Sequence, residues 1–495
     1  MTKREGRRGW TEAMLMLMAI LVVSAGALWA SAQTFKSLVS FSGTNGSQPA
    51  TPLVQGFDGN LYGVTYGGGN VEPQCSTSLS SAGCGTVFRV TPAGVLTTLY
   101  AFCAQSGCTD GINPTGLAVG TDGNFYGTTA SGGSNGKGTI FKITPAGALT
   151  TLHNFADTDG SSPAGTMAGS SAGTFFGVTA NGGTNSWGTV FKITTTGTFT
   201  SLFDFNLSNG GTPESGLVLG TDGNFYGTTF FGGTSTACTY GCGTVFKITP
   251  AGVLTTLHSF ISTDGESPFG QLVQGIDGNF YGTTSQGGLS DCSSLDDGCG
   301  TVFKITRTGT LTTLASFDST NGGEPSGLFQ ATDGNFYGTT VIGGSSTTCD
   351  GGCGTLYSVT STGTLTTLRN FAKADGAAPG AAPSQSTNGT LYGTTQSGGS
   401  KCSPNGCGTV YSLSVSLGAF VETLPASGKV GAAVIILGSG LRGSTSVTFN
   451  GTAATFTVIS PTEIKTTVPT GATTGKVKVT TPSGVLTSNL NFRVQ

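Results

Sequence analysis

The 495-residue sequence contains two histidines, and their position does not favour catalysis. His153 and His258 each follow Thr-Leu in a Thr-Leu-His-x-Phe segment. Corresponding segments elsewhere in the chain carry Tyr100, Phe203, Ala315 and Arg369 at that position. Such variety is typical of a half-exposed strand position, and a Ser-His-Asp or Cys-His arrangement has no other histidine to use. We therefore expect neither histidine to be catalytic.

Paired carboxylates are a second chemistry that the sequence could support. Glycoside hydrolysis needs two carboxyl groups roughly 5 to 10 Å apart. The acidic residues that do not recur periodically include Glu72, Glu214, Glu266 and Glu324. The last three flank a proline-containing turn in successive segments, but nothing in the sequence singles out a pair. A carbohydrate-active or lyase-type enzyme that uses these acidic loop residues is therefore the alternative functional hypothesis.

Two further sets of polar residues recur and are expected to form turns. The motif (Asp/Asn)-Gly-x-x-Pro begins at Asn45, Asp110, Asp159, Asn209, Asp264, Asn321 and Asp375. The motif Asp-Gly-Asn begins at Asp58, Asp122, Asp222, Asp277 and Asp333, and we assign Ala172 and Thr387 to the position of the Asp in the other two units. These residue types favour Asx-type turns, whereas a Ca²⁺ ion needs about six to eight oxygen ligands. We expect no metal and no cofactor.

Residues 1–32 have the features of a secretory signal. Lys3, Arg4, Arg7 and Arg8 precede an apolar run that ends at Ala30-Ser31-Ala32, so we expect cleavage before Gln33, with an uncleaved anchor as the alternative. Cleavage removes four of 21 basic and two of 24 acidic residues, which leaves a net charge near −5. This charge argues against nucleic acid as a partner. We expect a secreted or cell-surface protein with no membrane span after cleavage.

The twelve cysteines fall into six neighbouring pairs, which are Cys75 and Cys84, Cys103 and Cys108, Cys238 and Cys242, Cys292 and Cys299, Cys349 and Cys353, and Cys402 and Cys407. In an exported chain an even number of locally paired cysteines predicts disulfides. The alternative is zinc, which usually requires two converging pairs or nearby histidines. Because the pairs lie in different repeats, we expect six local disulfides and no zinc.

Composition and repeats predict an all-β fold. Gly contributes 84 residues and charged residues only 9%, and Gly at this density is unfavourable in helices. The motif Asp-Gly-Asn-aromatic-Tyr-Gly-Thr-Thr recurs seven times with a mean period of 55 residues, alternating with Gly-Thr-Val-Phe-Lys-Ile-Thr and Leu-x-x-Phe segments. Each unit predicts four antiparallel strands. We therefore expect a seven-bladed β-propeller over residues 33–416, with a β-solenoid as the alternative.

The ends of the repeat array indicate how the ring closes. The chain enters with Leu38–Phe41, a fourth-strand segment that has no Gly-Thr-Val-Phe partner before it. It leaves with Gly408–Leu413, a third-strand segment with no Leu-x-x-Phe strand after it. The N-terminal strand can therefore complete the last blade, which removes the exposed sheet edges of an open array.

Residues 417–495 form a separate module with short alternating strands. The segments Gly438-Ser439-Gly440-Leu441, Val447–Gly451, Val468–Gly471 and Gly475–Val479 resemble the IPT/TIG family of immunoglobulin-like domains. This resemblance implies a small β-sandwich, which the alternating apolar residues also predict. The family occurs both in extracellular binding proteins and beside enzymes, so it implies an extracellular setting more than an activity.

The repeats themselves resemble the Gloeo/Verruco (GloVer) tandem-repeat family of exported bacterial proteins, through the Gly-Thr-Val-Phe and Asp-Gly-Asn-aromatic-Tyr-Gly motifs. That resemblance implies no established activity. Aromatic side chains in the variable loops, such as Trp187, Tyr240 and Phe231, could stack on sugar rings or fill loop cores. We expect a monomeric, non-enzymatic binding or scaffold protein whose partner is an extracellular polysaccharide or surface protein.

Overall fold

The computed structural model describes residues 33–75, 83–170, 173–288 and 298–495. The predicted signal segment at residues 1–32 and Cys292 lie outside these ranges. The regular structure of the described residues is β-strand except for one 3-10 helix, η1 (Ser106–Cys108). Within the same ranges, no helix has the length and apolar character needed to cross a membrane.

Seven four-stranded antiparallel sheets confirm the predicted β-propeller. In blades 1 to 6 the strands run from the innermost to the outermost in chain order. The first four blades are β2 (Val54–Gln55), β3 (Leu61–Thr65), β4 (Thr86–Val90) and β5 (Leu96–Ala101); β6 (Ile112–Val119), β7 (Phe125–Ser131), β8 (Thr139–Ile143) and β9 (Leu149–Asn154); β10 (Ser161–Gly169), β11 (Thr174–Asn181), β12 (Thr189–Thr194) and β13 (Phe199–Asp204); and β14 (Val218–Leu219), β15 (Phe225–Thr229), β16 (Thr244–Ile248) and β17 (Leu254–Ser259).

The last three blades include the one that closes the ring. Their strands are β18 (Val273–Gln274), β19 (Phe280–Thr284), β20 (Thr301–Ile305) and β21 (Leu311–Ser316); β22 (Gly323–Gln330), β23 (Phe336–Ile342), β24 (Thr355–Val359) and β25 (Leu365–Asn370); and β26 (Ser384–Gln385), β27 (Leu391–Thr395), β28 (Thr409–Ser414) and β1 (Thr34–Ser40). In blade 7, β1 pairs antiparallel with β28, from Thr34 opposite Ser414 to Ser40 opposite Thr409. The first strand of the chain therefore closes the ring, as predicted.

The repeated Phe-Tyr-Gly-Thr-Thr strand is fully buried because it packs against its own blade and the next one. In blade 4, Tyr226 stacks on Phe280 of blade 5 with ring centroids 3.9 Å apart. A Cβ atom at Gly227 would lie 2.7 Å from the ring of Phe246 and 2.8 Å from Leu217, so only glycine fits there. Equivalent inter-blade stacks join Tyr62 to Phe125, Tyr126 to Phe175, Phe176 to Phe225 and Tyr281 to Phe336.

A second contact between blades explains the proline and glycine motifs. The residue before each motif proline has a left-handed backbone. Its N–H donates to a backbone carbonyl in the previous blade, that of the residue that precedes Gly-Thr-Val-Phe. In blade 5, Ser267 has φ 53° and donates to the carbonyl of Cys242 at 2.9 Å. A Cβ atom at Gly243 would lie 2.6 Å from Pro268 Cδ, and its φ is +95°. Both features require glycine. We call this contact the blade joint.

The C-terminal module is a two-sheet β-sandwich. One sheet contains β29 (Glu422–Leu424), β31 (Ala433–Leu437), β35 (Glu463–Thr467) and β34 (Phe456–Ser460), and the other contains β30 (Ser427–Gly428), β37 (Gly484–Val494), β36 (Gly475–Thr481), β32 (Ser446–Phe449) and β33 (Thr452–Ala453). Val434, Ile436, Val447, Phe449 and Val477 are in its buried core. We keep the domain boundary between residues 416 and 417 as a prediction.

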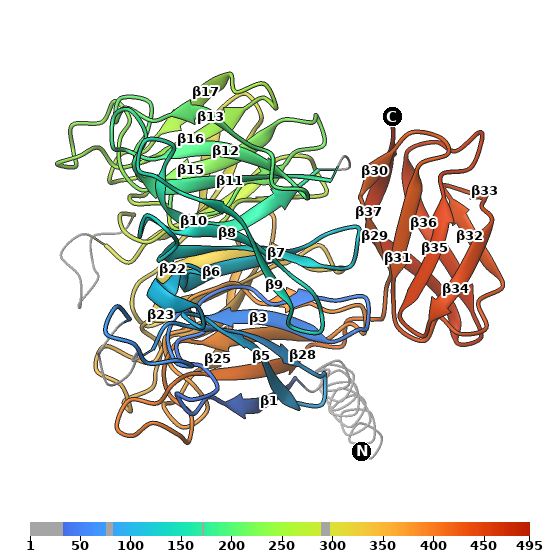
Figure 1. Ribbon diagram of the computed structural model, residues 1–495, viewed down its shortest axis with the longest axis horizontal. Coiled ribbons are helices and arrows are strands. Elements are labelled where there is room, and N and C mark those ends of the chain that lie inside the picture. Colours follow the sequence, from blue (N-terminus) through green and yellow to red (C-terminus); the bar gives the residue numbers. More distant parts are fainter. Residues whose placement is uncertain (1–32, 76–82, 171–172, 289–297) are drawn as a thin grey trace, which may run out of the picture.

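The sandwich lies against one face of the propeller (Figure 1). Thr462 donates its hydroxyl to the carbonyl of Phe57 at 2.7 Å, and the Phe420 N–H donates to the carbonyl of Thr387 at 3.0 Å. These contacts involve or adjoin the Asp-Gly-Asn turns, so we call this side the sandwich face. The cysteine loops and the proline turns lie at the other ends of the strands, on the side that we call the loop face.

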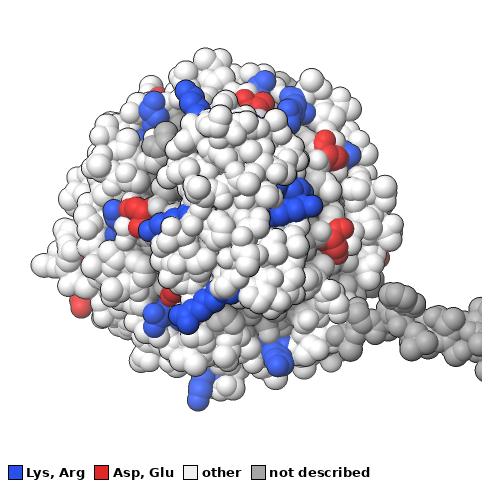
Figure 2. Space-filling model, turned by 90° about the vertical axis from the view of Figure 1, so that its right-hand side faces the viewer, with Lys and Arg blue, Asp and Glu red and all other residues white. Residues whose placement is uncertain are grey.

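Charges on the sandwich side are of both signs. Figure 2 shows that Lys and Arg lie around the sandwich, with Asp and Glu close to several of them. Two aspartates of the Asp-Gly-Asn turns form ion pairs, Asp122 with Lys142 at 2.9 Å and Asp277 with Lys304 at 2.8 Å. This mixed pattern differs from the continuous basic surface that favours nucleic acid.

We predict that deleting residues 34–40 abolishes the cooperative unfolding of the propeller. The deletion leaves β28 as an open sheet edge and removes the strand that joins the two ends of the ring. Differential scanning calorimetry should show a broadened transition or aggregation, while Lys36→Ala, at an exposed position of the same strand, should melt as the parent does. An unchanged transition after the deletion would contradict closure by β1.

Candidate functional site

The loop face contains a pocket of about 620 Å³ that is lined by all seven blades. Each blade contributes the residue that follows its motif proline, namely Ala50, Thr115, Ala164, Glu214, Phe269, Ser326 and Gly380. The blade joint fixes the backbone on the other side of that proline, so these seven residues are held in or just before the innermost strands. The pocket therefore lies at the centre of the ring. Most residues that line the pocket have small and largely apolar side chains, and Glu214 contributes a carboxylate.

The structure separates the glutamates that the sequence grouped together. Glu214 follows its proline and lines the pocket, where burial raises the pKa of its carboxyl. Glu324 immediately precedes its proline and donates its N–H to the carbonyl of Cys299 at 3.1 Å; burial also raises its pKa. Glu266 lies two residues before its proline and pairs through its backbone with Gln286. Neither Glu266 nor Glu324 lines the pocket, and Glu72 is exposed.

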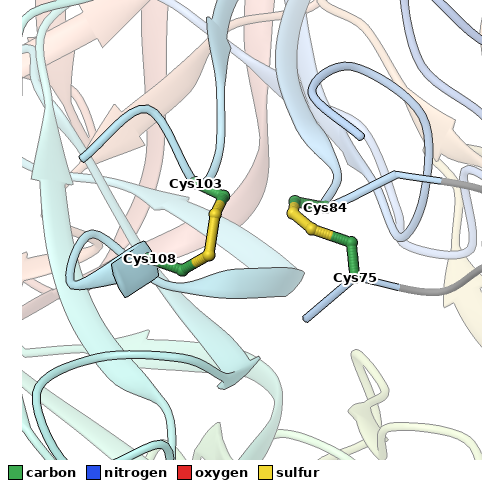
Figure 3. Close-up of side chains that lie close together, drawn as sticks. All are labelled: Cys75, Cys84, Cys103 and Cys108. Atoms are coloured by element: carbon green, nitrogen blue, oxygen red, sulfur yellow. A yellow bond between two sulfur atoms is a disulfide. The ribbon is translucent and has the colours of Figure 1, made fainter. Parts of the chain in front are cut away.

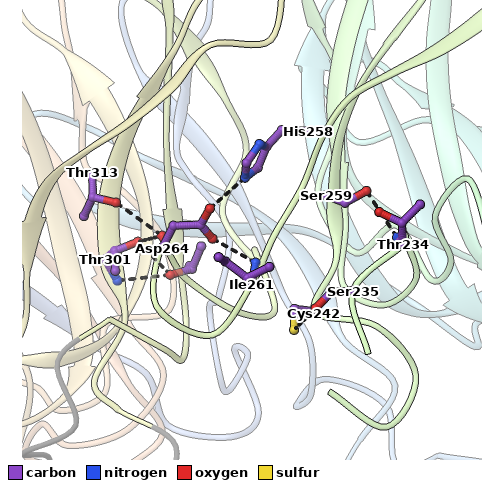
Figure 4. Close-up of polar contacts among 10 residues, drawn as sticks. Thr234, Ser235, Cys242, His258, Ser259, Ile261, Asp264, Thr301 and Thr313 are labelled. Atoms are coloured by element: carbon purple, nitrogen blue, oxygen red, sulfur yellow. Dashed lines mark hydrogen bonds and ion pairs between the residues drawn. The ribbon is translucent and has the colours of Figure 1, made fainter. Parts of the chain in front are cut away.

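Each histidine contacts the aspartate of a proline turn, and the two histidines lie in different blades. His258 contacts Asp264 at 2.9 Å, and the other carboxylate oxygen of Asp264 accepts the N–H of Ile261 (Figure 4). His153 contacts Asp159 in the same way, also at 2.9 Å. Burial lowers the pKa of His153, although Asp159 opposes this shift. Both histidines therefore hold the aspartate of the next proline turn.

These contacts relate the strand position of the histidines to the first residue of the proline-turn motif, and the sequence analysis missed this relation. The turn residue is Asp where the preceding strand supplies a donor, in the pairs Tyr100–Asp110, His153–Asp159, His258–Asp264 and Arg369–Asp375. It is Asn where the corresponding strand residue is apolar, in the pairs Val39–Asn45, Phe203–Asn209 and Ala315–Asn321. The Asn side chains accept the same backbone N–H bond, as between Asn209 and Asn206 at 3.1 Å. Comparing the two columns of the repeat could have found this pairing.

The Asp-Gly-Asn aspartates are also engaged within the fold, as the predicted Asx turns require. Asp122 accepts hydrogen bonds from Asn124, Tyr126 and Lys142. Burial opposes ionisation of Asp122, but these bonds outweigh it and lower its pKa to about 2. In four other blades the same aspartate accepts the hydroxyl of a tyrosine four residues later, in the pairs Asp58–Tyr62, Asp222–Tyr226, Asp277–Tyr281 and Asp333–Tyr337.

One assignment in this set was wrong by one residue. Asn388, not Thr387, occupies the aspartate position in blade 7, because its Oδ1 accepts the N–H of Thr390 at 2.9 Å and its Nδ2 donates to the Tyr392 hydroxyl. Thr387 instead accepts a hydrogen bond from Gln55 through its hydroxyl and contacts the sandwich. The side chain of Asn has the same length as that of Asp and still makes the turn, so the motif persists without its charge.

Five of the expected cysteine pairs are disulfide-bonded in the structure. Their Cα atoms are 4.1 to 5.5 Å apart, in Cys75–Cys84, Cys103–Cys108, Cys238–Cys242, Cys349–Cys353 and Cys402–Cys407. The sixth predicted pair includes Cys292, which lies outside the described residues. The described cysteines include none that is free.

Two of these disulfides converge, which the sequence analysis did not expect. Cys75, Cys84, Cys103 and Cys108 are buried, and their sulfur atoms all lie within 4.8 Å of one another (Figure 3). The position of the pairs in different repeats is therefore no reason to exclude zinc, because two of the pairs meet in space. Oxidation disfavours zinc at this cluster, because a disulfide sulfur has no thiolate to offer a metal. A second group joins Cys238, Cys242 and Glu266, and its cysteines are likewise bonded to each other.

Two family models match the chain. The Gloeobacter/Verrucomicrobia repeat model matches residues 74–296 and 292–435, and the IPT/TIG domain model matches residues 420–494. No curated protein matches the chain.

Several solved structures are similar over most of the chain. The extracellular domain of a hybrid two-component system from B. thetaiotaomicron is 11% identical over 92% of this chain and 52% of that chain, with a TM-score of 0.49. A gluconolactonase from Xanthomonas campestris is 12% identical over 79% and 92%, with a TM-score of 0.39. A protein described as a 6-phosphogluconolactonase from Bacteroides uniformis is 19% identical over 68% and 88%, with a TM-score of 0.43. Similarities at this level assign no ligand or activity to this chain.

We predict that the pair formed by His258 and Asp264 can be exchanged for the pair found at Phe203 and Asn209. His258→Phe alone should destabilise the protein by about 1 kcal/mol, because it leaves an oxygen of the half-buried Asp264 carboxylate without its partner. Adding Asp264→Asn should recover most of that loss. Urea denaturation of the parent, the single variants and the double variant measures the coupling. A double variant no more stable than His258→Phe would show that the two positions are independent.

We predict that the mature protein carries twelve oxidised cysteines, paired locally. Intact-mass measurement before and after reduction counts the oxidised thiols, and peptide mapping without reduction identifies the partners. The decisive peptides contain Cys75, Cys84, Cys103 and Cys108, whose sulfurs are close enough for exchange. Cross-pairing among these four, or zinc bound in stoichiometric amount, would contradict the local assignment.

Proposed function

The chain belongs to the Gloeobacter/Verrucomicrobia repeat family, and we propose that it is an exported binding or scaffold protein whose ligand enters the loop-face pocket and is not chemically converted. The partner in this proposal is an extracellular polysaccharide or a surface protein. The observation that carries the proposal is the lining of the pocket, which is concave, mostly apolar and supplied by all seven blades. Such a lining with a few polar groups is typical of ligand sites.

The distribution of carboxylates supports binding over catalysis. The aspartates of the two repeated motifs accept hydrogen bonds from backbone N–H groups and neighbouring side chains, so their oxygens are already used by the fold. Among the residues that line the pocket, Glu214 is the single acidic one. Acid–base cleavage of a glycosidic bond ordinarily uses two carboxyl groups across the scissile bond. A binding pocket needs only one to orient a ligand hydroxyl.

The setting that we propose is outside the cell. Local disulfides are typical of exported proteins, and the predicted signal segment is consistent with secretion or surface attachment. We propose a monomer with no nucleic-acid partner, in keeping with its slightly negative charge and the mixed charges around the sandwich.

One observation favours a second candidate function. Burial raises the pKa of Glu214, and a raised pKa is what a general acid requires at neutral pH. An enzyme that uses Glu214 with a group contributed by its substrate is therefore the alternative.

Parallel assays of binding and turnover distinguish the two. We expect immobilised extracellular polysaccharides or surface proteins to retain the protein, and soluble glycoside and ester substrates to yield no product. Glu214→Gln should weaken retention, whereas Glu72→Gln, at an exposed position outside the pocket, should not. Product release that is lost in Glu214→Gln and kept in Glu72→Gln would reject the binding-only proposal and establish the enzyme.

A further inference from the structure

The seven repeats are not equally regular on the loop face, and the departures gather in one sector. The two residues after Gly-Thr-Thr or its equivalent lie at or just beyond the end of the second strand of each blade, at the rim. In blade 4 they are Phe230 and Phe231. The same positions elsewhere are Tyr66-Gly67, Ala130-Ser131, Ala180-Asn181, Ser285-Gln286, Val341-Ile342 and Gln396-Ser397. Blade 4 alone places two aromatic rings there.

Three more aromatic residues adjoin these two from neighbouring loops and blades. The ring of Trp187, from blade 3, lies 6.2 Å from that of Tyr240 in the cysteine loop of blade 4, and Tyr240 lies 5.8 Å from Phe231. Phe231 contacts Phe230 at 4.8 Å, and Phe230 lies 6.5 Å from Phe269 at the start of blade 5. We call these five residues the aromatic arc. It crosses three blades without interruption.

The arc ends in the pocket. Phe269 lines the pocket and follows its motif proline exactly as Glu214 does one blade earlier. The seven equivalent positions therefore carry their one large aromatic residue and their one carboxylate on adjacent blades. A second polar group of the pocket lining is Thr51, whose hydroxyl is buried and has no hydrogen-bond partner among the described residues.

The rings of the arc are arranged differently from the stacked rings of the core. Between blades, pairs such as Tyr226 and Phe280 stack at 27° with centroids 3.9 Å apart, so each ring covers the face of the other. Along the arc the interplanar angles are 47° to 86°. Tyr240 and Phe269 also remain 55% and 39% exposed. The rings of Tyr240 and Phe269 are therefore accessible to a ligand, although large aromatic side chains normally bury their faces.

We propose that the aromatic arc is a stacking platform for a glycan chain, which passes over Tyr240 and Phe231 and places one sugar unit in the pocket beside Phe269 and Glu214. This inference rests on the proposed function and names its ligand class. A sugar ring presents an apolar C–H face to an aromatic side chain and hydroxyl groups at its edge. The arc supplies the first kind of contact, and Glu214 supplies the second.

Charge favours a neutral glycan over a protein partner. The arc contains no charged side chain, and Glu214 is the one charged residue of the pocket lining. A protein hot spot of this kind is usually surrounded by a wide rim that excludes water. The arc is instead a narrow path of side chains that leads into a concave site, which suits an extended polymer.

The chain offers its own reporter for this proposal. After residue 32, Trp187 is the single tryptophan in the sequence. In the secreted protein its fluorescence therefore comes from one end of the arc. Titration with soluble xylan, dextran, galactomannan and β-glucan should change the emission for the polysaccharide that binds, and affinity electrophoresis in the same polymers gives the dissociation constant independently.

Variants of the arc then test its role in binding. Tyr240→Ala and Phe231→Ala should each weaken binding about fivefold or more, the loss expected for a residue at the centre of a binding site. Ile342→Ala removes a side chain from the same repeat position as Phe231, but in blade 6, and should leave the affinity unchanged. Tyr240 is largely exposed, so its truncation should also leave the melting temperature unchanged.

The outcomes separate this inference from the proposed function. Polysaccharide binding that weakens in both arc variants and not in Ile342→Ala supports the arc. If Glu214→Gln weakens polysaccharide binding while the arc variants behave as Ile342→Ala does, the arc is rejected and the pocket proposal stands. If the protein retains a surface protein but none of the polysaccharides, the glycan is rejected and binding stands. If it retains neither, both proposals fail.

Discussion

The blade joint is the interaction on which the rest of this structure depends. In every blade, the residue before the motif proline has a left-handed backbone and donates its N–H to a carbonyl of the preceding blade. In blade 1, Gln48 donates to the carbonyl of Cys407 at 3.0 Å, and in blade 7, Ala378 donates to the carbonyl of Cys353 at 3.0 Å. The proline ring packs where the preceding Gly-Thr-Val-Phe glycine has no Cβ. Seven non-glycine residues accept an unfavourable backbone conformation to make this contact, at an expected cost of about 1–3 kcal/mol each. The joint therefore constrains both motifs, and the joint between Gly408 and Pro49 connects blade 7 to blade 1 in the ring that β1 closes.

The joint and the two sets of Asx turns also determine where function can reside. Aspartates such as Asp222 and Asp264 use their oxygens to hold turns and neighbouring strands. Changing them would disturb the ring before it altered a ligand site. Positions outside these contacts are free to vary, and two such columns reach the loop face. One follows the motif proline and includes Glu214 and Phe269. The other follows Gly-Thr-Thr and includes Phe231.

The sequence was sufficient for the architecture because each blade carries the same local signals. Period, turn residues and the complementary strands at the two ends predicted seven blades and closure by β1, and these are confirmed. Contacts between distant positions were harder to predict. The partnership of His258 with Asp264 joins one strand to the following turn, and it shows only when two columns of the repeat are compared. The convergence of Cys84 and Cys103 depends on how two loops fold over each other, which no local pattern encodes. The misassigned Thr387 shows that a one-residue offset in a degenerate turn changes which side chain is placed in a motif.

Near-symmetry has opposite consequences for binding and for catalysis in such a ring. A central pocket built from seven equivalent turns is lined by seven similar backbone segments. Such a lining suits a ligand made of repeated units, but it does not create a unique pair of reactive groups. Uniqueness must come from divergence in the columns that the fold leaves free. In this chain the aromatic residues Phe230, Phe231 and Phe269 stand in these columns and form the arc together with Trp187 and Tyr240 from the loops, and one carboxylate, Glu214, lies in the pocket beside its end. Aromatic residues at the variable positions add contact area for a ligand along the arc. Additional carboxylates at these positions would instead add reactive groups in the pocket. The composition of the free positions therefore favours recognition of an extended polymer over its cleavage.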